Sequence, residues 1–222
     1  MQELKKELKE IIKSVKTYME AEALAGIEEF YSQAQTLLPE GQTLDQLCQE
    51  VSGCQLCSLH KTRNKLVFGQ GNPRAKLVFV GEAPGREEDL RGEPFVGQAG
   101  ELLTKIIEAM GLRRQDVYIC NVLKCRPPQN RQPLPEEILA CKDYLWQQLE
   151  MIGPKVVCCL GKYASLALLS QDLPITKFRG AFLDFRGLKV MPTFHPAYLL
   201  RNPAAKRLVW EDMQKVMAEL KK

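Results

Sequence analysis

Short apolar segments alternate along this chain with segments of helical periodicity. The sequence LVFVG at 77–81 is apolar up to its glycine, which is typical of a buried strand. Helical periodicity follows at 98–110, and Gly111 provides a stop. The alternation continues with strands expected at 117–123 and 155–161, helices at 135–152, 162–169 and 204–220, and a hairpin at 181–193 that leads into a last strand. Such alternation predicts an α/β sandwich with a mostly parallel sheet.

Charge is distributed unevenly over the 222 residues. Residues 1–50 contain 5 Lys and Arg against 10 Asp and Glu, whereas residues 51–222 contain 26 against 17. A basic body favours a polyanionic partner. No window approaches the roughly 18 consecutive apolar residues of a membrane span, and the N-terminus has no apolar signal region. We therefore expect a cytoplasmic protein without a membrane partner.

Residues 1–47 are expected to form an N-terminal helical extension. Apolar residues at i+3 and i+4 spacing between Lys and Glu predict an amphipathic helix over 3–20. Such a helix lies on the body or frays in solution, or it makes a short coiled-coil contact with a partner. About two clean heptads favour the first interpretation, because a coiled coil needs about three to four. We expect a monomer.

The residues that directly follow the predicted strands are the first candidates for a site, because ligands of parallel sheets bind beyond the carboxyl ends of the strands. These residues are Glu82 to Gly85, Asn121, Gly161 and His195. The turn at 81–85 exposes backbone N–H groups that suit an anion, but no P-loop signature follows it. Its acidic neighbours, taken alone, favour a solvated turn that caps a helix. A single histidine at this edge is more often structural than catalytic.

Cysteine spacing indicates a metal or cluster site. Cys54 and Cys57 form a C-x2-C pair, Cys125 follows the second strand, and Cys141 lies within a predicted helix. Four thiolates suit a structural zinc ion or a [4Fe-4S] cluster, and spacing alone leaves both open. Cys125 and Cys141 also fit as small buried hydrophobic residues. The other cysteines are expected to fill the core or lie on a helix face; they are Cys48, Cys120, Cys158 and Cys159.

Three loops have features that suit contact with nucleic acid, and each feature also has a purely structural explanation. Phe95 lies between turn residues and suits a stacking platform or a core plug. The stretch at 125–133 is rigid and basic, so it suits a path along phosphates or a surface connection. Leu199 and Leu200 beside Arg201 suit a wedge into a duplex, or the start of a core helix.

Five motifs occur in one order. They are Cys54-x-x-Cys57, GEAPGREED at 81–89, GEPFVGQAG at 92–100, NVLKCRPPQNRQP at 121–133 and FHPAYLLRNP at 194–203. Together they resemble the family 4 uracil-DNA glycosylases, the iron–sulfur branch of that superfamily, over about 48–220. The resemblance implies a three-layer α/β/α sandwich around a mostly parallel four-stranded sheet, with the glycosylase domain at 48–222. It implies hydrolysis of the N-glycosidic bond of uracil in DNA, which releases uracil and leaves an abasic site.

The resemblance also assigns residues to the base. His195 matches the family's histidine and would donate from a neutral imidazole to the uracil O2, where negative charge develops. Phe95 matches the residue on which the extruded uracil stacks. Asn121 matches the asparagine that accepts from uracil N3–H and donates to O4, an arrangement that rejects cytosine.

By the resemblance, Glu82 is the catalytic carboxylate. It would either activate water or stabilise the sugar cation. In the best-known branch of the superfamily, a catalytic aspartate stands at the position that Ala83 occupies here. The same motif of that branch ends in a tyrosine that blocks the methyl group of thymine, and Gly85 takes its place in this chain. Glu88 is a candidate for shaping the wall of the pocket that would exclude thymine. Asn130 matches a second family asparagine with a supporting role.

The same resemblance makes Cys54, Cys57, Cys125 and Cys141 the ligands of a structural [4Fe-4S] cluster. The expected phosphate contacts are Arg126, Arg131 and Arg201, and the partner is uracil-containing DNA, single- or double-stranded. Three alternatives remain. One is a superfamily member that captures uracil-DNA covalently, although the short spacing at 91–95 lacks the histidine-containing loop of that variant. Another is a binding module without enzymatic activity. The third is a polymerase-associated accessory protein, which only the N-terminal helix supports.

Overall fold

The computed structural model describes residues 42–169 and 174–222, so the predicted helix at 3–20 lies outside the described residues. These residues form a six-stranded sheet of order β1-β3-β2-β4-β6-β5. Its strands are β1 (Gln70–Gly71), β2 (Leu77–Gly81), β3 (Tyr118–Asn121), β4 (Val156–Leu160), β5 (Leu183–Phe185) and β6 (Leu188–Thr193). The four central strands are parallel, and the short edge strands β1 and β5 pair antiparallel. The predicted four-stranded sheet is therefore confirmed at its centre and extended at both edges.

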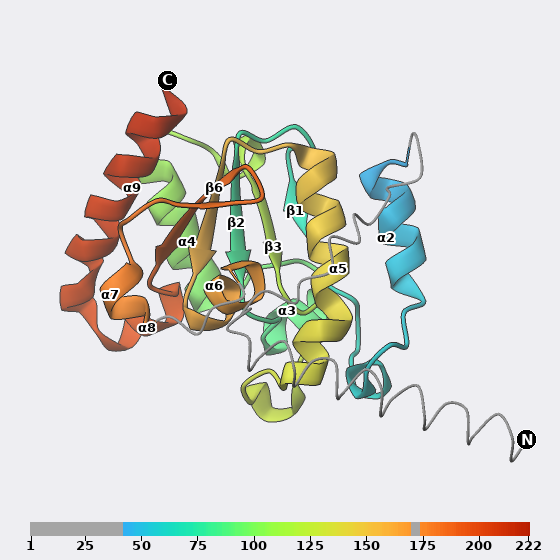
Figure 1. The fold of residues 1–222 in the computed structure, drawn as a ribbon. Coiled ribbons are helices and arrows are strands. Elements are labelled where there is room, and N and C mark those ends of the chain that lie inside the picture. Colours follow the sequence, from blue (N-terminus) through green and yellow to red (C-terminus); the bar gives the residue numbers. More distant parts are fainter. Residues whose placement is uncertain (1–41, 170–173) are drawn as a thin grey trace, which may run out of the picture. The chain divides into compact units, whose positions relative to one another are not determined.

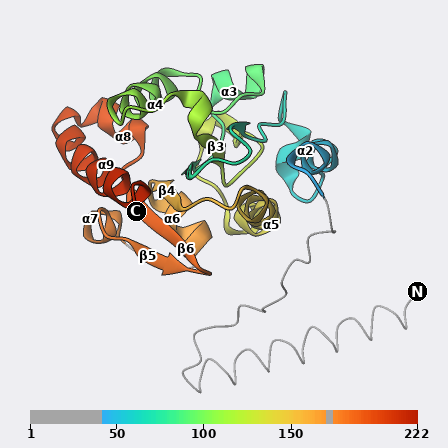
Figure 2. The same cartoon turned by 90° about the horizontal axis from the view of Figure 1, so that it is seen from above.

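Helices cover both faces of the sheet, as the two views in Figures 1 and 2 show. The helices are α2 (Leu44–Ser52), α3 (Arg86–Arg91), α4 (Gln98–Ala109), α5 (Pro135–Ile152), α6 (Lys162–Leu169), α7 (Ile175–Phe178), α8 (Pro196–Arg201) and α9 (Lys206–Leu220). Helices α4, α8 and α9 lie on one face, and α5 and α6 lie on the other. The predicted three-layer α/β/α class is confirmed.

Side-chain alternation along the strands produces two cores. In β2, Val78 and Val80 pack with α5 and α6, whereas Leu77 and Phe79 pack with α4 and α9. All five residues of β2 are buried, because helices cover both faces of a parallel sheet. A third, smaller cluster joins α2 to α5 through Leu47. The sheet is therefore held rigidly from both sides, which fixes the positions of its carboxyl ends.

Most expected segments form as the sequence indicates. The helix predicted at 135–152 is α5, and the hairpin predicted at 181–193 is β5–β6. Short elements were expected only in part: β1 was missed, α2 and α3 were indicated without bounds by the helix face expected for Cys48 and the helix cap expected at 81–85, and α8 was considered as one alternative for the Leu199 segment. Helix α2 begins with a capping box in which Thr43 and Gln46 exchange hydrogen bonds. Within the described ranges, no helix has the length and apolar character needed to cross a membrane.

Candidate active site

A cavity of about 450 Å³ opens at the carboxyl ends of the parallel strands. It brings together loops that follow β2, β3 and β6, as expected for a ligand site of a parallel sheet. Ten of the residues predicted from sequence line it: Glu82, Ala83, Gly85, Glu88, Phe95, Asn121, Asn130, Arg131, His195 and Arg201. Tyr198, which no sequence argument singled out, also lines the cavity and stacks on Phe194 with ring centroids 4.8 Å apart.

Asn121 is the last residue of β3 and lines this cavity with a buried amide. Its Oδ1 is buried and has no hydrogen-bond partner among the described residues. A buried carbonyl oxygen without a partner costs about 1–3 kcal/mol, so it points to a ligand that supplies a donor. Gly81, paired with Asn121 across the ladder, leaves the space for this amide, since a Cβ there would collide with Asn121 Oδ1.

The loop that contains Phe95 is fixed in a strained conformation. Phe95 has a φ of 54°, a left-handed value that is costly for a bulky residue. Its conformation is held from α3, because Glu88 Oε1 accepts hydrogen bonds from the N–H groups of Val96 at 2.9 Å and Gly97 at 3.0 Å. Glu88, predicted as part of the pocket wall, therefore also positions the aromatic side chain of the pocket.

Arg114 holds the same loop from its other side and was missed by the sequence analysis. Its guanidinium donates to the main-chain oxygen of Pro94 and to Thr104 Oγ1. Gly100 allows α4 to approach this loop, since a Cβ there would overlap the main-chain oxygen of Phe95. No motif pointed to Arg114, because it comes from a turn in front of β3 and reaches the loop only in the folded chain.

His195 follows β6 and forms the N-cap of α8. Its Nδ1 accepts a hydrogen bond from the Ala197 N–H at 3.1 Å, so in the neutral ring the proton lies on Nε2. Burial, and then the nearby positive charge of Arg201, lowers the pKa of His195 to about 4. The ring stacks against Phe95 with centroids 5.6 Å apart. The imidazole is therefore a neutral hydrogen-bond donor at neutral pH.

Of the described residues, two carboxylates line the cavity, and Glu82 is the one without a partner. Its side chain has no hydrogen bond or ion pair among the described residues, while its main-chain oxygen accepts from Leu123. Burial raises the pKa of Glu82 to about 6. A carboxylate that is partly desolvated and unpaired suits a group that interacts with a developing positive charge or with water.

The three arginines predicted to contact phosphates differ in how far their guanidinium groups are already engaged with other residues. Arg201 is exposed at the rim of the cavity. Arg126 donates through Nε to Asn130 Oδ1 at 2.7 Å and keeps its terminal nitrogen atoms available. Arg131 forms two hydrogen bonds, at 2.9 and 2.6 Å, with the buried carboxylate of Glu137. Arg131 is thus primarily a structural residue that shapes the loop at 126–131.

The two leucines predicted to form a wedge have different environments. Leu199 is 1% exposed and belongs to the core between α4 and α9, so the prediction that Leu199 enters DNA is wrong. The reason is the helical conformation of 196–201, which turns neighbouring side chains in different directions. Leu200 is 43% exposed and remains available.

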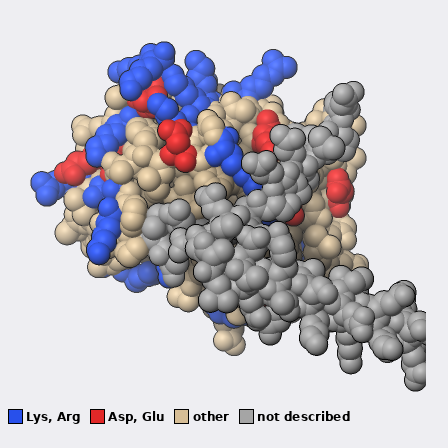
Figure 3. Space-filling view, in the orientation of Figure 1, with Lys and Arg blue, Asp and Glu red and all other residues tan. Residues whose placement is uncertain are grey.

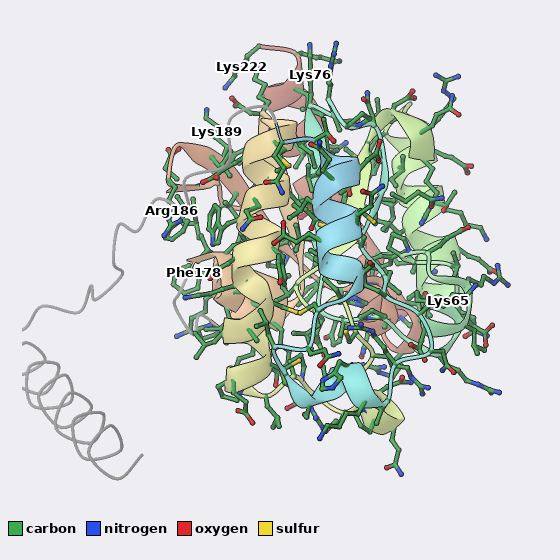
Figure 4. All side chains as sticks on the ribbon, turned by 90° about the vertical axis from the view of Figure 1, so that its right-hand side faces the viewer. Lys65, Lys76, Phe178, Arg186, Lys189 and Lys222 are labelled. Atoms are coloured by element: carbon green, nitrogen blue, oxygen red, sulfur yellow. The ribbon has the colours of Figure 1, made fainter. Side chains whose placement is uncertain are left out.

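The four cysteines predicted as ligands line a second, small pocket between the end of α2, α5 and the loop after β3. Figure 4 looks onto α2 and α5 and shows sulfur atoms near the lower ends of these helices. Arg63 donates to Cys125 Sγ at 3.2 Å and to the main-chain oxygen of Cys54 at 3.0 Å. Burial raises the pKa of the Cys141 thiol to about 11. The donor set fits a group that takes four thiolates.

The cysteine side chains surround this pocket without meeting at one point. Among the described residues, no three His, Cys, Asp or Glu side chains are arranged around a single ion position. Of the remaining cysteines, Cys120, Cys158 and Cys159 are fully buried in the strands, as expected for core residues. Cys48 is partly exposed on α2.

The parallel sheet and the polar cavity at its carboxyl edge define an α/β protein with a ligand-binding site. Sequence comparison identifies the family to which it belongs. The model of the uracil DNA glycosylase superfamily matches residues 68–214. The chain belongs to this superfamily.

Within the superfamily, the chain is similar to type-4 uracil-DNA glycosylases. It is 50% identical to that of Thermotoga maritima, over 78% of this chain and 93% of the relative. It is 46% identical to that of Archaeoglobus fulgidus, over 79% and 92% of the two chains. A type-5 uracil-DNA glycosylase of Pyrobaculum aerophilum is 32% identical, over 66% of this chain and 71% of its own.

Proposed function

We propose that this protein hydrolyses the N-glycosidic bond of uracil in DNA, which releases uracil and leaves an abasic site for excision repair. The observation that supports this most directly is the buried Oδ1 of Asn121, which lacks a partner in a cavity also lined by Phe95, His195 and Glu82. Uracil supplies the missing donor as N3–H. Cytosine has no N3–H and carries an amine where Asn121 Nδ2 donates, so it would leave the amide unsatisfied.

Each group around the cavity has a step to perform. His195 Nε2–H donates to the uracil O2, where charge develops as the base leaves as an anion. The low pKa of His195 keeps the imidazole neutral, so it stabilises this charge without giving up its proton. Glu82, as a carboxylate, stabilises the oxocarbenium-like sugar or orients the attacking water. Phe95 provides the flat surface on which the extruded base stacks.

The basic character of the body suits a DNA substrate. On the face seen in Figure 3, Lys and Arg side chains cover more of the surface than Asp and Glu side chains do, with the residues drawn in grey left aside. Arg201, at the rim of the cavity, and the terminal nitrogen atoms of Arg126, in the loop after β3, are the groups proposed to hold phosphates. Leu200 is proposed as the apolar side chain that fills the space left by the extruded base.

We also propose that Cys54, Cys57, Cys125 and Cys141 hold a [4Fe-4S] cluster. A single zinc ion would need four sulfur atoms at about 2.3 Å from one point. Thiols spread around a pocket suit a four-iron cluster better, because each thiolate then binds a different iron atom. Base hydrolysis involves no electron transfer, so the cluster would supply a structural link between the loops after α2 and β3.

The test is a single-stranded oligonucleotide with one uracil, incubated with protein and resolved on a denaturing gel with and without alkali. We expect cleavage at the uracil only after alkali treatment. A denaturant-resistant shifted band would instead indicate covalent capture, and unchanged DNA in both lanes would indicate a binding module. Either of these results would overturn the proposal.

A further inference from the structure

Lys124 is a buried lysine that takes no direct part in the proposed excision of uracil. It lies three residues after the end of β3, and its side chain is 1% exposed. Burying an ammonium group is costly unless it is fully bonded, so a lysine in this position requires a structural reason. Its bonding partners supply one.

The Lys124 ammonium bonds to two oxygen atoms. Nζ donates to the main-chain oxygen of Asn121 at 2.7 Å and to Oε1 of Gln148. Gln148 is fully buried and is itself fixed, because its Nε2 donates to the Phe68 main-chain oxygen at 2.9 Å and to Tyr118 Oη at 3.3 Å. The ammonium is therefore held at one place by a network that reaches α5 and two other segments.

The same lysine forms part of the wall of the four-cysteine pocket. It directly precedes Cys125 in the chain, and Cys125 and Cys141 line the same pocket. Lys124 therefore borders the four-cysteine pocket and bonds to the main chain of Asn121, which lines the cavity.

The bond to Asn121 fixes the peptide group that follows the base-reading residue. The carbonyl of this peptide accepts from Lys124 Nζ, and its N–H, that of Val122, donates to the Gly81 oxygen at 2.9 Å. The Asn121 side chain has no hydrogen bond of its own among the described residues. Its position therefore depends on the backbone that Lys124 and Gly81 hold. Displacement of a positioning group by about 1 Å can cost about 100-fold in rate.

We propose that Lys124 is a positioning residue for base recognition: its buried ammonium, anchored at the wall of the four-cysteine pocket, holds the main chain of Asn121 so that the amide meets uracil. The inference rests on the proposed function, because it gives Asn121 the role of reading the base. It adds a residue that never touches the substrate and acts through Asn121.

The experiment compares Lys124→Met with the unsubstituted protein at equal iron content per chain, measured colorimetrically. Methionine has a similar volume, and it removes the ammonium. Binding of labelled uracil is measured by equilibrium dialysis, and binding of a uracil-free single strand by fluorescence anisotropy. We expect uracil affinity to fall at least tenfold, kcat for excision to fall by a similar factor, and affinity for the uracil-free strand to stay within twofold.

The matched control is Lys215→Met, since Lys215 also donates from Nζ to a main-chain oxygen, that of Gly180, at 2.6 Å but outside the cavity. It should leave both affinities unchanged. If Lys124→Met gives no folded protein, Gln148→Leu keeps the charge and removes one of the two acceptors that orient Nζ. For this variant we expect about threefold weaker uracil binding with unchanged DNA binding.

Unchanged uracil affinity in the folded variant would overturn the inference, as would a parallel loss of affinity for uracil and for uracil-free DNA. Failure of the proposed function would be recognised separately, because the unsubstituted protein would then neither bind nor excise uracil. In that case the inference falls with the function on which it rests.

Discussion

The Nδ1 atom of His195 accepts a hydrogen bond from the N–H of Ala197 at 3.1 Å, and this contact gives one side chain two tasks. It caps helix α8 and places the ring proton on Nε2. Because the Nδ1 side is occupied, the imidazole can present only a donor to the cavity. Substitutions at this position can separate the cap from the donor.

His195→Asp should retain the cap and lose the donor, because a carboxylate accepts from the Ala197 N–H. We expect excision to fall about 100- to 1,000-fold with little change in the free energy of unfolding. His195→Ala should lose the same activity and about 1 kcal/mol of stability in addition. Rates come from single-turnover assays and stability from urea unfolding. Wild-type rates in His195→Asp would remove the imidazole from the mechanism.

Glu82 should make excision dependent on pH. Its pKa is raised to about 6, so the carboxylate is lost as pH falls through that value, and kcat should fall with it. The neutral His195, with a pKa of about 4, should add no inflection between pH 6 and 8. Glu82→Gln should lower the rate by about 100- to 10,000-fold and abolish the acid limb. An acid limb that persists in Glu82→Gln would assign it to another group.

The same substitution should stabilise the fold. A folded-state pKa above the ordinary value of 4.5 means that the folded protein binds the proton more tightly than the unfolded chain, so stability falls as pH rises from about 4.5 to above 6. Glu82→Gln removes this cost, which we put at about 1 kcal/mol for a half-buried group near solvent. Thermal unfolding at pH 5 and pH 8 should show the gain mainly at pH 8. Equal gains at both values would contradict this explanation.

Asn121→Asp should relax the rejection of cytosine. A protonated aspartic acid presents a donor to cytosine N3, and its carbonyl oxygen accepts from the cytosine amine. We expect measurable excision of cytosine from single-stranded DNA together with slower excision of uracil. Asn130→Asp is the control, because Asn130 lines the same cavity but bonds to Arg126. Strict uracil selectivity in Asn121→Asp would count against base reading by this amide.

Cys141→Ser should bind less iron and be less stable, because Cys141 lines the four-cysteine pocket within α5. Cys48→Ser, a partly exposed cysteine on α2, should keep its full iron content. Iron per chain and the visible absorbance of purified protein measure both. Full iron content in Cys141→Ser would mean that another residue is the fourth ligand.

Leu199 and Leu200 are neighbours with opposite expected effects. Leu199→Ala should destabilise the fold by about 2–5 kcal/mol, because Leu199 is buried in the core. Leu200→Ala should leave stability within about 0.5 kcal/mol and slow excision from duplex DNA more than from single strands. The ratio of the two excision rates is the measurement. An unchanged ratio would exclude Leu200 as the wedge.

The long elements of the fold follow from sequence because their signals are local. Helix α5 has a proline at its first position and a glycine after its end, and β2 is a run of apolar residues closed by Gly81. Helices α3 and α8 have six residues each, too few for periodicity to distinguish them from turns. The motifs likewise indicated which residues belong to the site, since family resemblance depends on residue order alone.

Sequence by itself determined the order of the long strands and helices, the superfamily and ten of the residues that line the cavity. Only the tertiary structure decided which side chains are free and which are engaged. Arg131 is paired with Glu137, Leu199 is in the core, and Asn121 Oδ1 is left without a partner. Lys124 acquires its role in the same way, through Gln148, 24 residues away in the chain. The physical reason is that burial and hydrogen bonding join distant segments, and no local pattern of residues encodes those contacts.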